Sequence, residues 1–146
     1  MRTKDFMARL NHGRIVDAIA AAEKTTSGEI RVFIQRGEVA DDPLPFAEAK
    51  FIELGMEKTA ERNAILVLVA PRAQKFGVVG DEGVHQKCGA EYWDQLVLKM
   101  RSHFQREEFT EAIVEAVESA GSLLAQYFPR QADDRNELSN EVVEGD

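Results

Sequence analysis

The run Ala64–Ala70, AILVLVA, most constrains the fold, because seven consecutive apolar residues lie between polar segments. A strand this uniformly apolar is typical of the centre of an α/β sheet, where both faces are covered. The run is too short to cross a bilayer as a helix, which needs about 20 residues. It therefore predicts a buried central strand with helices packed on both sides of it.

Two other segments have strand patterns. Glu29–Gln35, EIRVFIQ, alternates a firmly apolar face with a mixed one, and Lys75–Gly80 follows the central run after a connection at Pro71–Gln74. That connection is short enough for a hairpin, so the third strand should run antiparallel to the second. The first and second strands should be parallel, joined by a right-handed crossover through a helix.

Helical periodicity accounts for most of the remaining chain. The expected helices cover about residues 4–24, with Gly13 as a point of interruption, the stretch from Pro45 to Gly55, and two later segments lined by Trp93 to Phe104 and by Phe109 to Tyr127. The fold class is therefore α/β: a three-layer α/β/α sandwich around a small mixed β-sheet, with helices on both faces.

The chain has 146 residues, enough for one domain, which we place at residues 1–129. Pro129 ends the last helix, and residues 130–146 hold six acids with little apolar mass, so we expect a flexible acidic tail. An alternative interpretation of its NELSNEVV stretch is an edge strand that adds to the sheet of this domain or of a partner.

Charge and cysteine content exclude several classes of function. The net charge is −8, without the basic footprint of a nucleic-acid-binding or membrane-surface protein. Cys88 is the only cysteine, and the first residues lack a secretory signal, so we expect a soluble cytoplasmic protein. His85 and Cys88 are too few ligands for zinc, and no glycine-rich phosphate cradle or other organic cofactor site is visible.

Three polar segments should meet at one edge of the sheet. They are Thr26–Glu29 before the first strand, Glu61–Asn63 before the second, and Asp81–Gly83 after the third. Because the third strand runs backward, its end lies beside the starts of the other two. Residues that are remote in sequence should therefore form one polar cluster.

Oxygen ligands in such a cluster suit a hard cation. Calcium takes six to eight oxygens in flexible loops, and magnesium is the alternative ion. We expect Asp81 as the first ligand, with Glu82, Glu29 and Asn63 as helpers.

An anionic ligand such as phosphate is also conceivable here, bound by Arg62 with Ser27. The competing interpretation is structural: Asp81 caps the following helix, Arg62 pairs with Glu29 or Asp81, and Asn63 closes a turn.

A second, weaker cation site is predicted at the opposite edge of the sheet. Asp41 and Asp42 follow the first strand, and Glu38 lies close by in sequence. An ordinary solvated loop is the competing interpretation.

Several phrases resemble the TPM domain family, in particular its short, soluble bacterial branch. They are TTSGEIRVFI, FIELGMEKTAERNAILVLVA, FGVVGDEGVHQKCGAEYWDQLVLKM and LLAQYFP, in this order between about His12 and Pro129. The resemblance implies an α/β/α sandwich, calcium binding as in some members, and weak acid phosphatase activity as in plant members. The plant members' catalytic residues do not map as a set onto this chain.

Three functional hypotheses follow. The first is a calcium-binding accessory domain that recognises a protein partner, unidentified from sequence. The second is a weak metal-dependent phosphatase acting on phosphomonoesters, in which Asp81 holds the ion and Arg62 stabilises charge. The third is a metal-free protein-interaction scaffold that works through a helix face.

Overall fold

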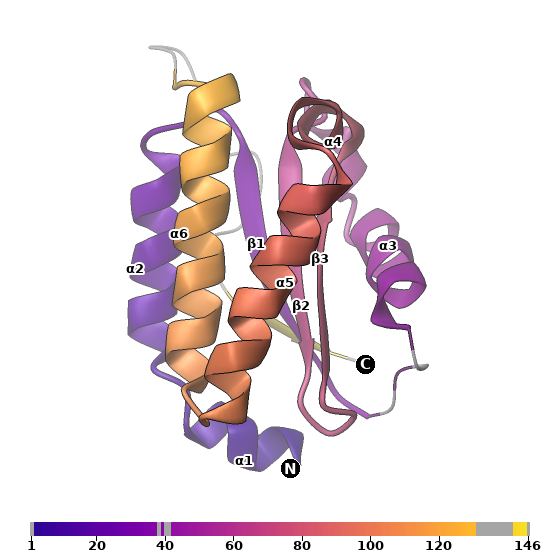
Figure 1. Cartoon of the computed structure of the whole chain (residues 1–146), viewed down its shortest axis with the longest axis vertical. Coiled ribbons are helices and arrows are strands. Elements are labelled where there is room, and N and C mark those ends of the chain that lie inside the picture. The colour runs from indigo at the N-terminus through magenta and orange to yellow at the C-terminus, as the bar shows by residue number, and fades with distance from the viewer. Residues whose placement is uncertain (1, 38, 40–41, 131–141, 146) are drawn as a thin grey trace.

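A mixed four-stranded sheet forms the middle of the molecule in the computed structural model, which describes residues 2–37, 39, 42–130 and 142–145 (Figure 1). The strand order is β3-β2-β1-β4. The strands are β1 (Glu29–Gln35), β2 (Ala64–Ala70), β3 (Lys75–Gly80) and β4 (Val143–Gly145). The pairing of β1 with β2 is parallel and that of β2 with β3 is antiparallel, which confirms the predicted topology.

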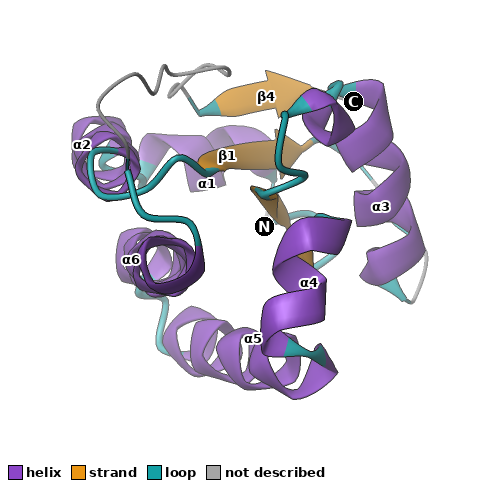
Figure 2. Ribbon diagram, turned by 90° about the horizontal axis from the view of Figure 1, so that it is seen from above, coloured by secondary structure: helices purple, strands orange, loops and turns teal. Residues whose placement is uncertain are grey.

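Helices cover both faces of this sheet, so the predicted three-layer sandwich is confirmed (Figure 2). One face is covered by α1 (Thr3–Ala8), α2 (His12–Glu23), α5 (Ala90–Gln105) and α6 (Phe109–Tyr127). The other face is covered by α3 (Pro43–Glu53) and the short 3-10 helix η1 (Met56–Lys58). The helix α4 (Glu82–Cys88) follows β3.

Alternation along the two central strands divides the core into two clusters. Ile65, Val67 and Val69 of β2 pack toward α2, α5 and α6, while Leu66 and Leu68 pack toward α3. Every residue of β2 is at most 2% exposed, as its uniform apolar character predicts.

The helix boundaries differ from the sequence expectation in three places. The N-terminal helix breaks before Gly13, because Asn11 caps α2 by accepting a hydrogen bond from the backbone N–H of Arg14 (3.1 Å). The helix expected from Pro45 begins at Pro43, with Asp42 as its cap. The short helix α4 precedes the two long ones and is capped by Asp81.

Part of the acidic C-terminal stretch is an edge strand. Val143–Gly145 pairs in parallel with Phe33–Gln35 of β1, and Glu144 forms an ion pair with Arg36 (2.8 Å). The expectation of a flexible tail therefore does not extend to β4, whereas residues 131–141 lie outside the described part of the chain. No helix within the described ranges is long and apolar enough to cross a membrane.

Candidate functional site

The predicted polar segments meet at one edge of the sheet, which we call the amino edge because β1 and β2 begin there. Glu29 is in register with Ala64, and Ile65 is in register with Gly80. The residues just before β2 therefore lie between the start of β1 and the segment that follows β3.

Asp81 and Arg62 form the tightest contact of the amino edge. The Arg62 guanidinium donates two hydrogen bonds to the Asp81 carboxylate, from Nε to Oδ2 and from Nη2 to Oδ1, both of 2.8 Å. Asp81 Oδ1 also accepts from the backbone N–H of Glu82 (2.7 Å) and so caps α4. Hydrogen bonding to Asp81 and its negative charge raise the pKa of Arg62. Both carboxylate oxygens of Asp81 are thus already engaged.

Ser27 and Asn63 form a second group with Glu61. The Ser27 hydroxyl donates to Glu61 Oε2 (2.9 Å), and the Asn63 amide donates to the same oxygen (3.2 Å) and to Ser27 Oγ (3.3 Å). Asn63 is buried, and its backbone N–H donates to Thr59 Oγ1 (3.2 Å). These bonds join the segment before β1 to the segment before β2.

Glu29 faces a different neighbour, Glu23 at the end of α2. Both carboxyl groups are buried, and they share a side-chain hydrogen bond. Burial is the main reason that the pKa of Glu23 rises to about 9, and the bond with Glu29 adds to the rise. Glu23 also accepts from the backbone N–H of Ile30 (3.0 Å). Sequence reasoning missed this pair, because nothing in the helical pattern marks Glu23 as buried.

The amino edge fits a metal ion only if Arg62 moves. Glu82 lies 3.9 Å from Arg62, and the charges of Glu82 and Glu57 add to that of Asp81 in raising the pKa of the guanidinium. Arg62 is therefore the cation that these carboxylates surround. Across the described ranges, no three His, Cys, Asp or Glu side chains are placed to hold a metal ion.

The second predicted cation site falls largely outside the described residues. Glu38 and Asp41 lie outside the residues that the structure describes. Asp42 caps α3 by accepting a hydrogen bond from the backbone N–H of Leu44 (3.1 Å).

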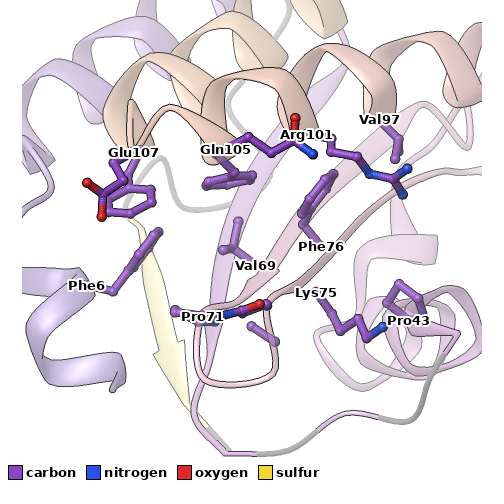
Figure 3. A pocket seen from close by; sticks show the side chains of 14 residues that line it. Phe6, Pro43, Val69, Pro71, Lys75, Phe76, Val97, Arg101, Gln105 and Glu107 are labelled. Atoms are coloured by element: carbon purple, nitrogen blue, oxygen red, sulfur yellow. The ribbon is translucent and has the colours of Figure 1, made fainter. Parts of the chain in front are cut away.

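A cavity of about 530 Å³ lies at the opposite, carboxyl edge of the sheet, where β2 ends in its hairpin with β3 (Figure 3). We call it the aromatic pocket. It is bounded by α1, by the start of α3, by the β2–β3 hairpin, and by the chain from the C-terminal part of α5 to the start of α6. Its lining includes Phe6, Val69, Lys75, Phe76, Val97, Arg101, Phe104, Gln105, Glu107 and Phe109.

Four phenylalanine rings line this pocket. The ring centroids of Phe76 and Phe104 are 4.9 Å apart, those of Phe104 and Phe109 are 6.0 Å apart, and those of Phe109 and Phe6 are 5.0 Å apart. These spacings are typical of attractive tilted aromatic contacts. Phe6 is buried, while the other three rings are only partly covered. The pocket therefore presents partly open aromatic surface.

The charged groups of the pocket are divided between its two sides. Glu107 pairs with Arg9 (3.5 Å), whose guanidinium also lies over the Phe109 ring. Figure 3 shows Lys75 and Arg101 on the side of the pocket away from Phe6 and Glu107. Neither Lys75 nor Arg101 forms an ion pair with any residue that the structure describes.

The sequence pattern indicates other roles for these residues. Phe104 and Phe109 belong to the predicted core faces of two helices, and Lys75 begins a predicted strand. The available signal was topological, because ligands of open α/β sheets gather beyond the carboxyl ends of parallel strands.

Comparisons with known proteins point to one family. The sequence profile of the TPM domain matches residues 2–123. The chain is similar to the BA42 protein of the psychrophilic bacterium Bizionia argentinensis, with 35% identity, a TM-score of 0.83, and coverage of 94% of this chain and 96% of that one. The N-terminal domain of cg2496 from Corynebacterium glutamicum shares the fold at 15% identity, with a TM-score of 0.56 over 80% of this chain and 75% of that one. No curated protein sequence matches the chain.

Proposed function

The chain belongs to the TPM domain family, and from its geometry we propose that it is a ligand-binding accessory domain whose working site is the aromatic pocket. Of the three hypotheses drawn from sequence, this is nearest to the metal-free interaction domain, with a pocket in place of a helix face.

One observation carries the proposal: a concave site, largely lined by aromatic and aliphatic side chains, also holds two cations without partners among the described residues. Small-molecule sites commonly have volumes of about 300–1,000 Å³ and combine an apolar lining with a few polar groups. The pocket's volume of about 530 Å³ falls within this range. Its place beyond the end of β2 is also where α/β sheets commonly bind ligands.

Two substitutions on neighbouring residues of α5 test the proposal. Val97 lines the aromatic pocket, whereas Leu98 is 59% exposed and does not line it. A neutral apolar probe, phenylbutyramide, should shift the backbone amide resonances of β3 and the end of α5 in isotope-labelled protein. Val97→Trp fills the pocket and should abolish these shifts, whereas Leu98→Trp should leave them intact. Equal binding by both variants, or no shift in the wild type at the solubility limit of the probe, overturns the proposal.

A cation site at the amino edge is a second proposal, favoured by the carboxylates that surround Arg62. An incoming calcium ion competes with the guanidinium for Asp81, so affinity should be weak in the wild type and severalfold tighter in Arg62→Gln. Amide shifts of Asp81–Gly83 during a calcium titration measure this, with Lys58→Gln as a charge-matched control. If saturating calcium moves no resonance in any of the three proteins, this proposal fails.

The phosphatase activity implied by the family resemblance stays a prediction. A phosphomonoesterase assay with calcium or magnesium, run on wild type beside Asp81→Asn, tests it. Equal turnover by both proteins would point to a contaminating enzyme.

A further inference from the structure

We propose that the aromatic pocket selects a small carboxylic acid, in its ionised form, whose body is a single aromatic ring or a short branched chain. This inference rests on the proposed function and adds the chemical class of the ligand. The polar cluster of the amino edge is not needed for this inference.

The charge of the pocket differs from that of the molecule as a whole. The whole chain carries −8, yet the pocket holds Lys75 and Arg101 without an ion-pair partner among the described residues. The acidic group of the lining, Glu107, is already paired with Arg9. An anion that enters the pocket therefore meets two cations that no carboxylate of the described residues pairs with.

The two cations of the pocket are suited in shape and hydrogen bonding to a carboxylate. A guanidinium presents two parallel N–H donors that match the two oxygens of a carboxylate, and Lys75 can add a third donor. Gln74 and Gln105, also in the lining, offer neutral amides for the rim. Donors of this kind match a single carboxylate, whereas phosphate dianions usually draw on more backbone N–H groups and a higher local charge.

The phenylalanine side chains of the pocket are suited to the apolar body of the ligand. Figure 3 shows Phe6 on one side of the pocket, and Lys75 and Arg101 on the other, with Val69 and Phe76 between them. A ligand with its carboxylate at the cationic side therefore directs its apolar end toward the phenylalanine rings. The partly exposed rings of Phe104 and Phe109 can pack on an aromatic group at tilted or edge-to-face angles.

The test compares three probes on the full chain by amide shift titration: phenylbutyrate, its neutral amide phenylbutyramide, and phenyl phosphate. We expect phenylbutyrate to bind about tenfold more tightly than the amide, as one or two charge-assisted hydrogen bonds imply. Phenyl phosphate should bind more weakly than phenylbutyrate. Lys75→Gln and Arg101→Gln should each weaken phenylbutyrate several-fold and leave the affinity for the amide nearly unchanged.

Lys87→Gln removes the same charge from an exposed position on α4 outside the pocket, and it should change neither affinity. Equal binding of phenylbutyrate and its amide, or a preference for phenyl phosphate, overturns the ligand class while leaving a binding pocket in place. Absence of pocket shifts with all three probes overturns the proposed function as well. A thermal melt of each variant shows whether lost binding reflects lost folding.

Discussion

Glu23 shows at the scale of one residue how burial changes chemistry. Glu23 is 5% exposed, its carboxyl group lies beside that of Glu29, and its pKa rises to about 9 from an ordinary value of 4.5. The folded protein therefore keeps a proton there at neutral pH, where the unfolded chain has released it. A carboxyl pKa that is raised in the folded state increases the free energy of unfolding. This contribution is complete below about pH 4.5 and is lost as the pH rises to about 9.

Glu23→Gln removes this titration while keeping a neutral hydrogen-bonding side chain. Relative to wild type, the variant should gain stability as the pH rises from about 5 to about 8, by up to roughly 1.4 kcal/mol per pH unit. Urea unfolding at several pH values measures the difference. Glu118→Gln, on the exposed face of α6, is the matched control and should show no such trend. Parallel stability curves for wild type and Glu23→Gln would contradict the argument.

Asp81 is the other informative residue, because both structural interpretations of it hold at once. It caps α4 and binds Arg62. A carboxylate before a helix is recognisable in sequence as a cap, but the identity of its ion-pair partner depends on the strand that brings residue 62 beside it.

At the scale of elements, Gly83 explains how α4 fits the amino edge. A Cβ on Gly83 would overlap the backbone carbonyl oxygens of Glu61 and Arg62, at 2.6 Å from the latter. The backbone N–H of Gly83 donates to the Arg62 carbonyl oxygen (2.9 Å). This close approach sets the position of α4 against the segment that precedes β2.

Gly83→Ala should therefore destabilise the fold by about 1–3 kcal/mol, since backbone atoms cannot yield to the added methyl group. Gly13 is also a helical glycine, and its nearest neighbour would be Asn11 Oδ1 at 3.7 Å. Gly13→Ala should be neutral or stabilise by up to about 1 kcal/mol. Chemical denaturation of both variants measures the contrast, and equal effects would show that helix propensity alone explains them.

At the scale of the whole molecule, the two edges of the sheet have different characters. At the amino edge, polar groups from three segments bind one another, and Arg62 balances the surrounding carboxylates. At the carboxyl edge, partly open rings and two cations that have no ion-pair partner within the described ranges surround a cavity. The same strand directions that bring the predicted polar cluster together also place the hairpin and the end of α5 around the pocket.

The amino-acid pattern alone determined the elements whose signal is local. The apolar run of β2, the alternation in β1 and the hairpin signal before β3 predicted the strands with their bounds and directions, and the family followed from motifs in their order. The sequence also predicted that the three polar segments meet, because the directions of the strands decide which strand ends lie at the same edge of the sheet.

Only tertiary structure decided which groups satisfy one another. Arg62 takes both oxygens of Asp81, Glu29 turns to Glu23, and rings from α1, β3 and the α5–α6 region surround one cavity. Side-chain pairing and the shape of a cavity depend on distances between residues far apart in sequence. A local periodicity in the sequence contains no information about these distances.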